Sequence, residues 1–190
     1  MIKIPNEDLF TSIPDKKKIN YNNESFSTYM KTVENDKLLD GNVANFRHKS
    51  KEGGLDTIGF GHKLTEEENK NNMVYGYDLS EINSSTSPER ILEISNDILR
   101  QDLEKAEKIL TKNYGNKFIN LDLRRKQMLI DFQFNGGAGM VTLFKKFRTA
   151  VFAGDEKTMK KEYIRSFKAA NGTRKTLARN DFFKKYFLNK

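Results

Sequence analysis

Residues 52–62 read Glu-Gly-Gly-Leu-Asp-Thr-Ile-Gly-Phe-Gly-His, and this stretch decides the fold of the chain. Its first two glycines indicate a tight turn, because glycine adopts backbone conformations that other residues avoid. Its last two glycines flank Phe60, at a place where the backbone must come close to a neighbouring group. The whole segment 35–62 consists of short apolar pieces separated by glycines. It therefore predicts a small antiparallel sheet with tight turns.

An amphipathic helix is expected directly before this segment. Phe26, Met30 and Val33 fall at positions i, i+4 and i+7, which is the spacing of one helical face. Glu34 lies at the edge of that apolar face, where the helix is expected to end. A carboxyl group beside apolar side chains loses solvation, so we expect a raised pKa that keeps Glu34 protonated near neutral pH.

The remainder of the chain has mainly helical periodicity. Thr65 with Glu68 forms a capping-box pattern, which predicts a short helix. Ser87 followed by Pro88 is typical of a helix start, and helical spacing then continues through residues 88–112. Such a helix is about 37 Å long at 1.5 Å per residue. Beyond it we expect an all-helical, phenylalanine-rich bundle, with helices over 123–134, 141–152, 158–167 and 173–187.

The composition limits the chemistry. With 34 Lys and Arg against 26 Asp and Glu, the formal net charge is +8, which favours an anionic partner such as nucleic acid, a membrane surface or an acidic polymer. The absence of cysteine excludes disulfides, thiolate metal sites and a cysteine nucleophile. Two histidines do not suffice for a histidine-rich metal site. No export signal or membrane-spanning stretch is expected.

The order of these motifs resembles the phage-type lysozymes, the family of the T-even phage lysozyme, over about residues 26–187. In that family a helix ending in a catalytic Glu leads into a hairpin that carries Thr-Ile-Gly-aromatic-Gly-His, as residues 57–62 do here. Residues 100–106, Arg-Gln-Asp-Leu-Glu-Lys-Ala, are similar to the family's long-helix motif. The Asp of that motif pairs with the hairpin His, so the resemblance implies that Asp102 and His62 form a structural pair.

Two later stretches resemble the same family. Residues 131–137, Asp-Phe-Gln-Phe-Asn-Gly-Gly, are similar to the start of its helical lobe, which implies that Asn135 lines the substrate cleft. The stretch that begins with Arg174 and Lys175 resembles the closing basic helix, and the resemblance implies that these two residues bind substrate. This stretch departs from the family pattern at Arg179, which stands where an acidic residue is usual.

The resemblance implies an α+β, mostly helical fold of two lobes, in which a small antiparallel sheet lobe and a helical lobe are joined by a long helix. Residues 1–22 are interpreted as an N-terminal extension and 23–190 as one lysozyme domain. Within it, 23–87 hold the catalytic helix and sheet lobe, 88–112 the connecting helix and 113–190 the helical lobe.

The implied activity is that of a glycoside hydrolase that cleaves the β-1,4 bond between N-acetylmuramic acid and N-acetylglucosamine in peptidoglycan. Glu34 is the expected general acid, because glycosidic cleavage needs a group that protonates the leaving oxygen. We expect a monomer that uses no cofactor or metal and binds neither nucleic acid nor membrane. Without a signal peptide, it is expected to be made in the bacterial cytoplasm and to reach the wall through a holin or in a virion.

The second catalytic group is open. The family usually has an Asp shortly before the hairpin Thr, but an ungapped alignment places Lys51 there and one inserted residue places Ser50 there. Glu52 is the nearest acid and could supply the negative charge. Asp56 adjoins Thr57, so strand alternation points it to the opposite face. Thr57 itself is expected to orient the attacking water.

Two other mechanisms or functions stay open at this point. Without a second carboxylate, the 6-hydroxyl of the sugar could attack in place of water and give an anhydro sugar. A catalytically inactive lysozyme fold could instead hold glycan or another protein, for example in a virion. A basic helical nucleic-acid binder rests on net charge alone, because the sequence has no recognition motif.

Overall fold

The computed structural model describes residues 19, 21, 24–49, 55–137, 143–168 and 174–189. This part of the chain is mostly helical and carries three small antiparallel sheets. The predicted α+β, mostly helical class is thereby confirmed.

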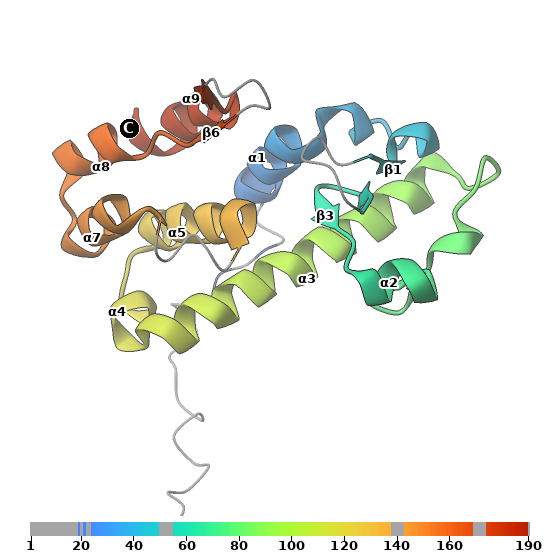
Figure 1. Cartoon of the computed structure of the whole chain (residues 1–190), viewed down its shortest axis with the longest axis horizontal. Helices are drawn as coiled ribbons and strands as arrows, with labels where there is room; N and C mark the ends of the chain where they lie inside the picture. Colours follow the sequence, from blue (N-terminus) through green and yellow to red (C-terminus); the bar gives the residue numbers. More distant parts are fainter. Residues whose placement is uncertain are drawn as a thin grey trace, which may run out of the picture.

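The longest element is helix α3 (Pro88–Tyr114), which crosses the molecule in Figure 1. Its start agrees with the sequence prediction, because the Ser87 hydroxyl accepts a hydrogen bond from the backbone N–H of Arg90 and Pro88 stands in the first turn. The helix ends at Tyr114, two residues later than predicted, and Gly115 is its C-cap. The apolar side chains of one face are buried, among them Ile91, Ile94, Ile98, Leu103 and Leu110.

One end of α3 carries the sheets of the first half of the chain (Figure 1). Strands β1 (Arg47–His48), β2 (Thr57–Ile58) and β3 (His62–Lys63) form an antiparallel sheet in the order β1-β2-β3. Helix α2 (Glu66–Asn71) follows, and its start has the predicted reciprocal capping box between Thr65 and Glu68. A second hairpin, β4 (Met73–Val74) with β5 (Tyr77–Asp78), was not predicted. Three 3-10 turns complete this part: η3 (Asp36–Leu38), η4 (Val43–Asn45) and η5 (Leu79–Glu81).

The other end of α3 carries the second half of the chain. Its helices are α4 (Asn116–Ile119), α5 (Leu123–Gly136), α7 (Lys145–Ala153), α8 (Glu156–Glu162) and α9 (Arg179–Phe183), and a π-helical turn, η7 (Lys184–Leu188), follows α9. The expectation that this region is all helical is wrong. Strands β6 (Ser166–Lys168) and β7 (Arg174–Thr176) pair antiparallel, with residue 167 opposite 175. This hairpin replaces the helical turns predicted to end at 167 and to begin at 173.

Helix α1 (Glu24–Asn35) lies between these two groups of elements (Figure 1). The side chains of Phe26 and Met30 are fully buried, as the helical periodicity predicts. The ring of Phe26 lies 6.4 Å from that of Phe187 near the other end of the chain. Ile19 and Tyr21, which precede α1 in the sequence, are also buried in the core. Packing against the core therefore begins before residue 23.

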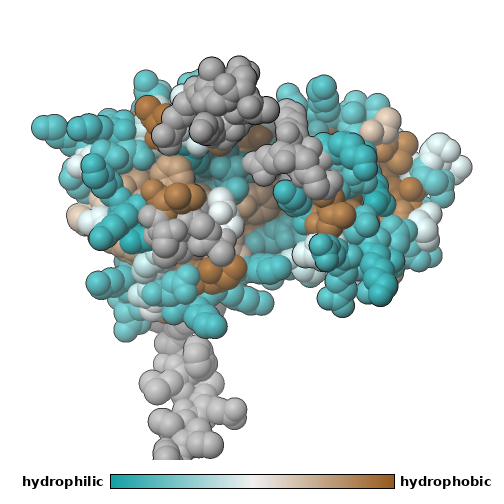
Figure 2. Space-filling view, in the orientation of Figure 1, coloured by the Kyte–Doolittle hydropathy of each residue, from teal (hydrophilic) through white to brown (hydrophobic). Residues whose placement is uncertain are grey.

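None of the helices that the structure describes is both long and apolar enough to cross a membrane. Hydrophilic side chains cover most of the face seen in Figure 2, with smaller hydrophobic areas between them. This agrees with a chain in which 32% of the residues are charged.

Candidate active site

Glu34 is held at the last turn of α1, between the two ends of the molecule. Its side chain is 13% exposed, so the carboxylate is largely buried but reaches solvent. Its neighbour Asn35 anchors the end of the helix, because the Asn35 amide donates to the carbonyl oxygens of Asn45 (3.1 Å) and Gly59 (3.2 Å). Glu34 is therefore fixed against the turn that joins β2 to β3.

The closest part of that turn is Gly61. Its backbone has φ +92°, and a Cβ built on it would lie 2.8 Å from Glu34 Oε2 and 3.2 Å from Glu34 Cβ. Only glycine allows both this backbone conformation and this approach. The glycine after Phe60 in the sequence motif thus makes room for the carboxyl group of Glu34.

The Gly61→Ala variant is expected to lose about 1–2 kcal/mol of unfolding free energy from backbone strain alone and to displace the Glu34 carboxylate as well. Gly76→Ala is a matched control, because Gly76 has φ +88° but an added Cβ would meet nothing within 4 Å. Urea unfolding measures the stability of both variants, and peptidoglycan clearing measures their activity. Both variants should lose stability, and only Gly61→Ala should lose clearing by more than its stability explains. Equal clearing by both would show that the contact with Glu34 is unimportant.

On its other side, Glu34 contacts the guanidinium group of Arg179. Arg179 begins α9, and its Nη1 donates to Glu34 Oε1 in an ion pair. Burial lowers the pKa of Arg179 to about 10, although Tyr29 opposes the change, so the guanidinium stays charged at neutral pH. Two opposing influences therefore act on Glu34. Partial burial favours the protonated carboxyl group, as the sequence analysis expects, and the cation favours the carboxylate.

Arg179 is itself part of a buried polar cluster. Asp131, on α5, is fully buried and accepts hydrogen bonds from Arg179 Nε (3.0 Å) and Nη2 (2.5 Å). Arg165 Nη1 donates to the other Asp131 oxygen at 2.7 Å, and the Tyr29 hydroxyl donates to Asp131 Oδ1 at 2.9 Å. Two anions and two cations thus balance in one cluster, and Glu34 is its most exposed charged member.

The groups proposed to act with Glu34 are only partly described. Thr57 lies half-buried in β2, opposite His48 and Lys63 in the sheet. No hydrogen bond joins its hydroxyl to Glu34 among the residues that the structure describes. Ser50 and Glu52, with Lys51 between them, lie outside the described residues. The identity of the second catalytic group therefore stays a prediction.

Asp56 is engaged elsewhere. Its carboxylate pairs with Arg47 Nε at 2.9 Å and with Lys49 Nζ at 2.8 Å. The hydrogen bond from Lys49, followed by that from Arg47, lowers the pKa of Asp56. A carboxylate held by two cations at the sheet surface agrees with its exclusion from the candidate catalytic groups.

His62 joins the sheet to α3. Its Nδ1 lies 2.9 Å from Asp102 Oδ2, and its Nε2 lies 3.3 Å from Glu68 Oε2. The Tyr75 hydroxyl donates to Asp102 Oδ1 at 2.6 Å. Burial lowers the pKa of His62, but Asp102 and then Glu68 outweigh it, and the net pKa is raised. The contacts are those expected of a structural pair, with Glu68 and Tyr75 as additional partners.

This raised pKa predicts a pH-dependent stability. A histidine whose pKa is raised on folding contributes stability that is fully present below its unfolded pKa of about 6.5 and is lost as pH rises through the folded value. The stability difference between wild type and His62→Gln should therefore be largest below about pH 6.5 and shrink as the pH rises above that value. Urea unfolding at several pH values measures it. His48→Gln is the control, because the described residues give His48 no carboxylate partner. A constant difference for His62→Gln would contradict the prediction.

The three residues predicted to bind substrate lie on the helical side. Asn135 is exposed on α5, one turn after Asp131. Arg174 and Lys175 lie in strand β7 and not in a helix, and their side chains lie outside what the structure describes. The structure therefore places Asn135 at the surface and leaves the contacts of the two basic side chains as predictions.

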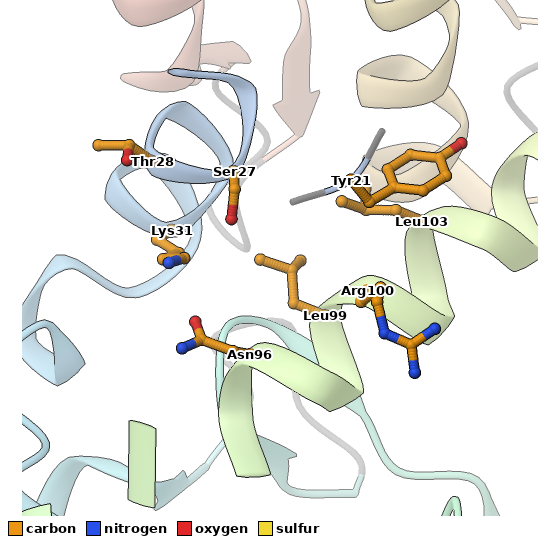
Figure 3. A pocket seen from close by; sticks show the side chains of 8 residues that line it. All are labelled: Tyr21, Ser27, Thr28, Lys31, Asn96, Leu99, Arg100 and Leu103. Atoms are coloured by element: carbon orange, nitrogen blue, oxygen red, sulfur yellow. The ribbon is translucent and has the colours of Figure 1, made fainter. Parts of the chain in front are cut away.

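A separate cavity of about 340 Å³ lies between α1 and α3 (Figure 3). Figure 3 shows the Leu99 side chain between the two helices, with Ser27 and Lys31 on the α1 side. The described residues that line it are Tyr21, Ser27, Thr28, Lys31, Asn96, Leu99, Arg100 and Leu103, and they include none of the predicted site residues. The cavity is therefore not assigned to the site around Glu34.

Within the described residues, no group of three or more His, Asp or Glu side chains is placed to hold a metal ion. No protein-family model matches the chain, and neither a curated protein nor a solved structure does.

Proposed function

We propose that the chain is a peptidoglycan-cleaving lysozyme of the phage type, with a two-lobed lysozyme-like fold and Glu34 as its general acid. The observation that carries the proposal is the position of Glu34, at the end of α1, against Gly61 of the hairpin turn and partly open to solvent. The order of motifs in the sequence adds the substrate class.

In this mechanism the Glu34 carboxyl group donates a proton to the glycosidic oxygen of the leaving sugar. The carboxylate that remains is stabilised by the adjacent Arg179 guanidinium. Thr57 orients the attacking water, and Glu52, or Ser50 at the usual Asp position, supplies the second group. Asn135, Arg174 and Lys175 bind the glycan.

The surplus of positive charge favours attraction to an anionic cell wall. The protein acts as a monomer without a cofactor, and it reaches the wall from the bacterial cytoplasm through a holin or in a virion. This route does not require nucleic acid or membrane as a binding partner.

One observation favours a second candidate, a wall-binding protein without catalysis. The ion pair with Arg179 favours the carboxylate form of Glu34, which cannot donate a proton. In this alternative the lysozyme fold holds glycan or another virion protein.

Mass spectrometry of the products from purified peptidoglycan tests these proposals. Hydrolysis gives fragments with a free reducing N-acetylmuramic acid end, which is the expected result. Fragments lighter by one water would show that the sugar hydroxyl attacks instead. Binding of the wall without release of fragments would refute catalysis and support the binding protein. A matched sample without protein shows which fragments were present at the start.

A further inference from the structure

The carboxyl group of Asp131 is buried away from solvent, and the proposed reaction does not use it directly. Burial raises its pKa, whereas the ion pair with Arg165 and the hydrogen bond from Tyr29 favour the charged form. Its side chain is 0% exposed, and its partner Arg165 is 2% exposed. The ring of Phe132 lies 4.3 Å from the Arg165 guanidinium carbon, which closes the cluster on that side. Burying such a group is costly unless it is paired, so its placement calls for a specific reason.

The contacts of Arg179 supply that reason. Its Nε and Nη2 point to Asp131, and only Nη1 points to Glu34. Nη2 also contacts the sulfur of Met30 at 3.7 Å. One planar guanidinium is thus shared by two carboxylates from different helices, and two of its three nitrogens donate to Asp131.

We propose that Asp131 is a positioning residue that holds Arg179 and, through it, sets the protonation of Glu34. The proposal rests on the proposed function in that Glu34 is the group whose protonation matters. Asp131 itself does not touch substrate. Its negative charge offsets part of the positive potential that Arg179 and Arg165 create at Glu34.

The charged members of the cluster reach Glu34 from the helical side of the molecule. Arg179 reaches it directly from α9, and Asp131 and Arg165 act from α5 and from the segment before β6. On the hairpin side, the uncharged backbone of Gly61 approaches Glu34 closely, and a Cβ built on it would lie 2.8 Å from Glu34 Oε2. With Asp131 present the two cations face two anions. Without the Asp131 charge, the two arginines face only one anion, Glu34. The carboxylate form of Glu34 is then more stable.

Tyr29 acts on the same carboxylate from α1. Its hydroxyl donates to Asp131 Oδ1, the oxygen that also accepts both bonds from Arg179. The hydroxyl proton therefore neutralises part of the Asp131 charge. With Asp131 held ionised by Arg165 and Arg179, removal of the hydroxyl strengthens the negative potential at Arg179 and Glu34. This effect has the opposite sign to the loss of Asp131.

The test is a titration of the Glu34 carboxyl carbon by NMR in the full chain labelled with ¹³C-glutamate, with Glu34→Gln used to assign the signal. In Asp131→Asn the midpoint should fall by about one pH unit, the lower end of the effect of a charge at close range. In Tyr29→Phe it should rise. This variant keeps the ring, which packs 4.7 Å from that of Tyr186, so it is expected to fold even where Asp131→Asn does not.

Asp181→Asn is the matched control, because Asp181 lies on the same helix as Arg179 and is exposed. It loses the same charge and should leave the Glu34 midpoint unchanged. The alkaline limb of peptidoglycan cleavage should move with the NMR midpoint, whereas a merely structural role would lower stability without moving either. An unchanged midpoint in Asp131→Asn, or in Tyr29→Phe if the former is unfolded, would overturn the proposal. If wild type releases no fragments and the midpoints still shift, the coupling stands and the proposed function fails.

Discussion

Replacing Glu34 by glutamine is expected to abolish the clearing of purified peptidoglycan while the chain stays folded. The amide has nearly the shape of the carboxyl group and can still accept a hydrogen bond from Arg179, but it cannot donate the proton that the leaving sugar oxygen needs. General acid catalysis contributes roughly 10²- to 10⁴-fold in rate, so at least a 100-fold loss is expected. Turbidity of a peptidoglycan suspension measures the rate, and thermal unfolding checks the fold.

A surface glutamate provides the control for this change. Glu93→Gln removes one charge from an exposed ion pair with Arg90 on α3, and it should clear the suspension at the wild-type rate. Clearing by Glu34→Gln at the wild-type rate, with normal unfolding, would refute the assignment of Glu34 as general acid. If both variants lose clearing, the loss comes from the change in net charge and not from the missing proton donor.

The largest expected effect on stability is that of Asp131→Ala. The change leaves the buried cations Arg165 and Arg179 with one anion, Glu34, in place of two. Removing one partner of a buried ion pair typically costs about 3–5 kcal/mol, because the remaining charge is left without compensation. The midpoint of urea unfolding should fall accordingly.

A double-variant cycle shows whether stranded charge is the cause. Arg165→Met removes one of the two cations, so its combination with Asp131→Ala should cost less than the sum of the single changes. Asp181→Ala, on exposed surface, should change the unfolding free energy by no more than about 0.5 kcal/mol. Additive costs, or an Asp131→Ala variant as stable as wild type, would show that the cluster is not electrostatically coupled.

Local sequence signals predicted the helix starts well. The Ser87 cap with Pro88 and the reciprocal bonds of Thr65 with Glu68 both depend on contacts within one turn, which is why the sequence reveals them. The apolar spacing around the β6–β7 hairpin also fits a helix, so the periodicity predicts helical turns there in place of the two strands. The sequence does contain Asn171-Gly172 between the two strands, a dipeptide typical of hairpin turns.

The sequence predicts the part of the site that depends on the hairpin motif. It does not predict the part that depends on partners far away in the sequence. Glycine at position 61 indicated a close backbone approach, and the structure shows Glu34 in that place. The cluster around Asp131 depends on segments more than 30 residues apart, and no local pattern encodes it. One signal was available, since Asp131 interrupts the apolar run Met128-Leu129-Ile130 and Phe132. An acid inside such a run needs a buried partner.

The pairing of Glu34 with Arg179 also constrains how the protein is made. The two residues are 145 positions apart, and synthesis proceeds at about 5–20 residues per second, so Glu34 is made roughly 7 to 30 s before its partner. During that interval α1 lacks α9, and its apolar residues Phe26 and Met30 have no final packing partners from that region. A growing chain therefore cannot assemble the charge balance around its proposed acid until α9 has been synthesised.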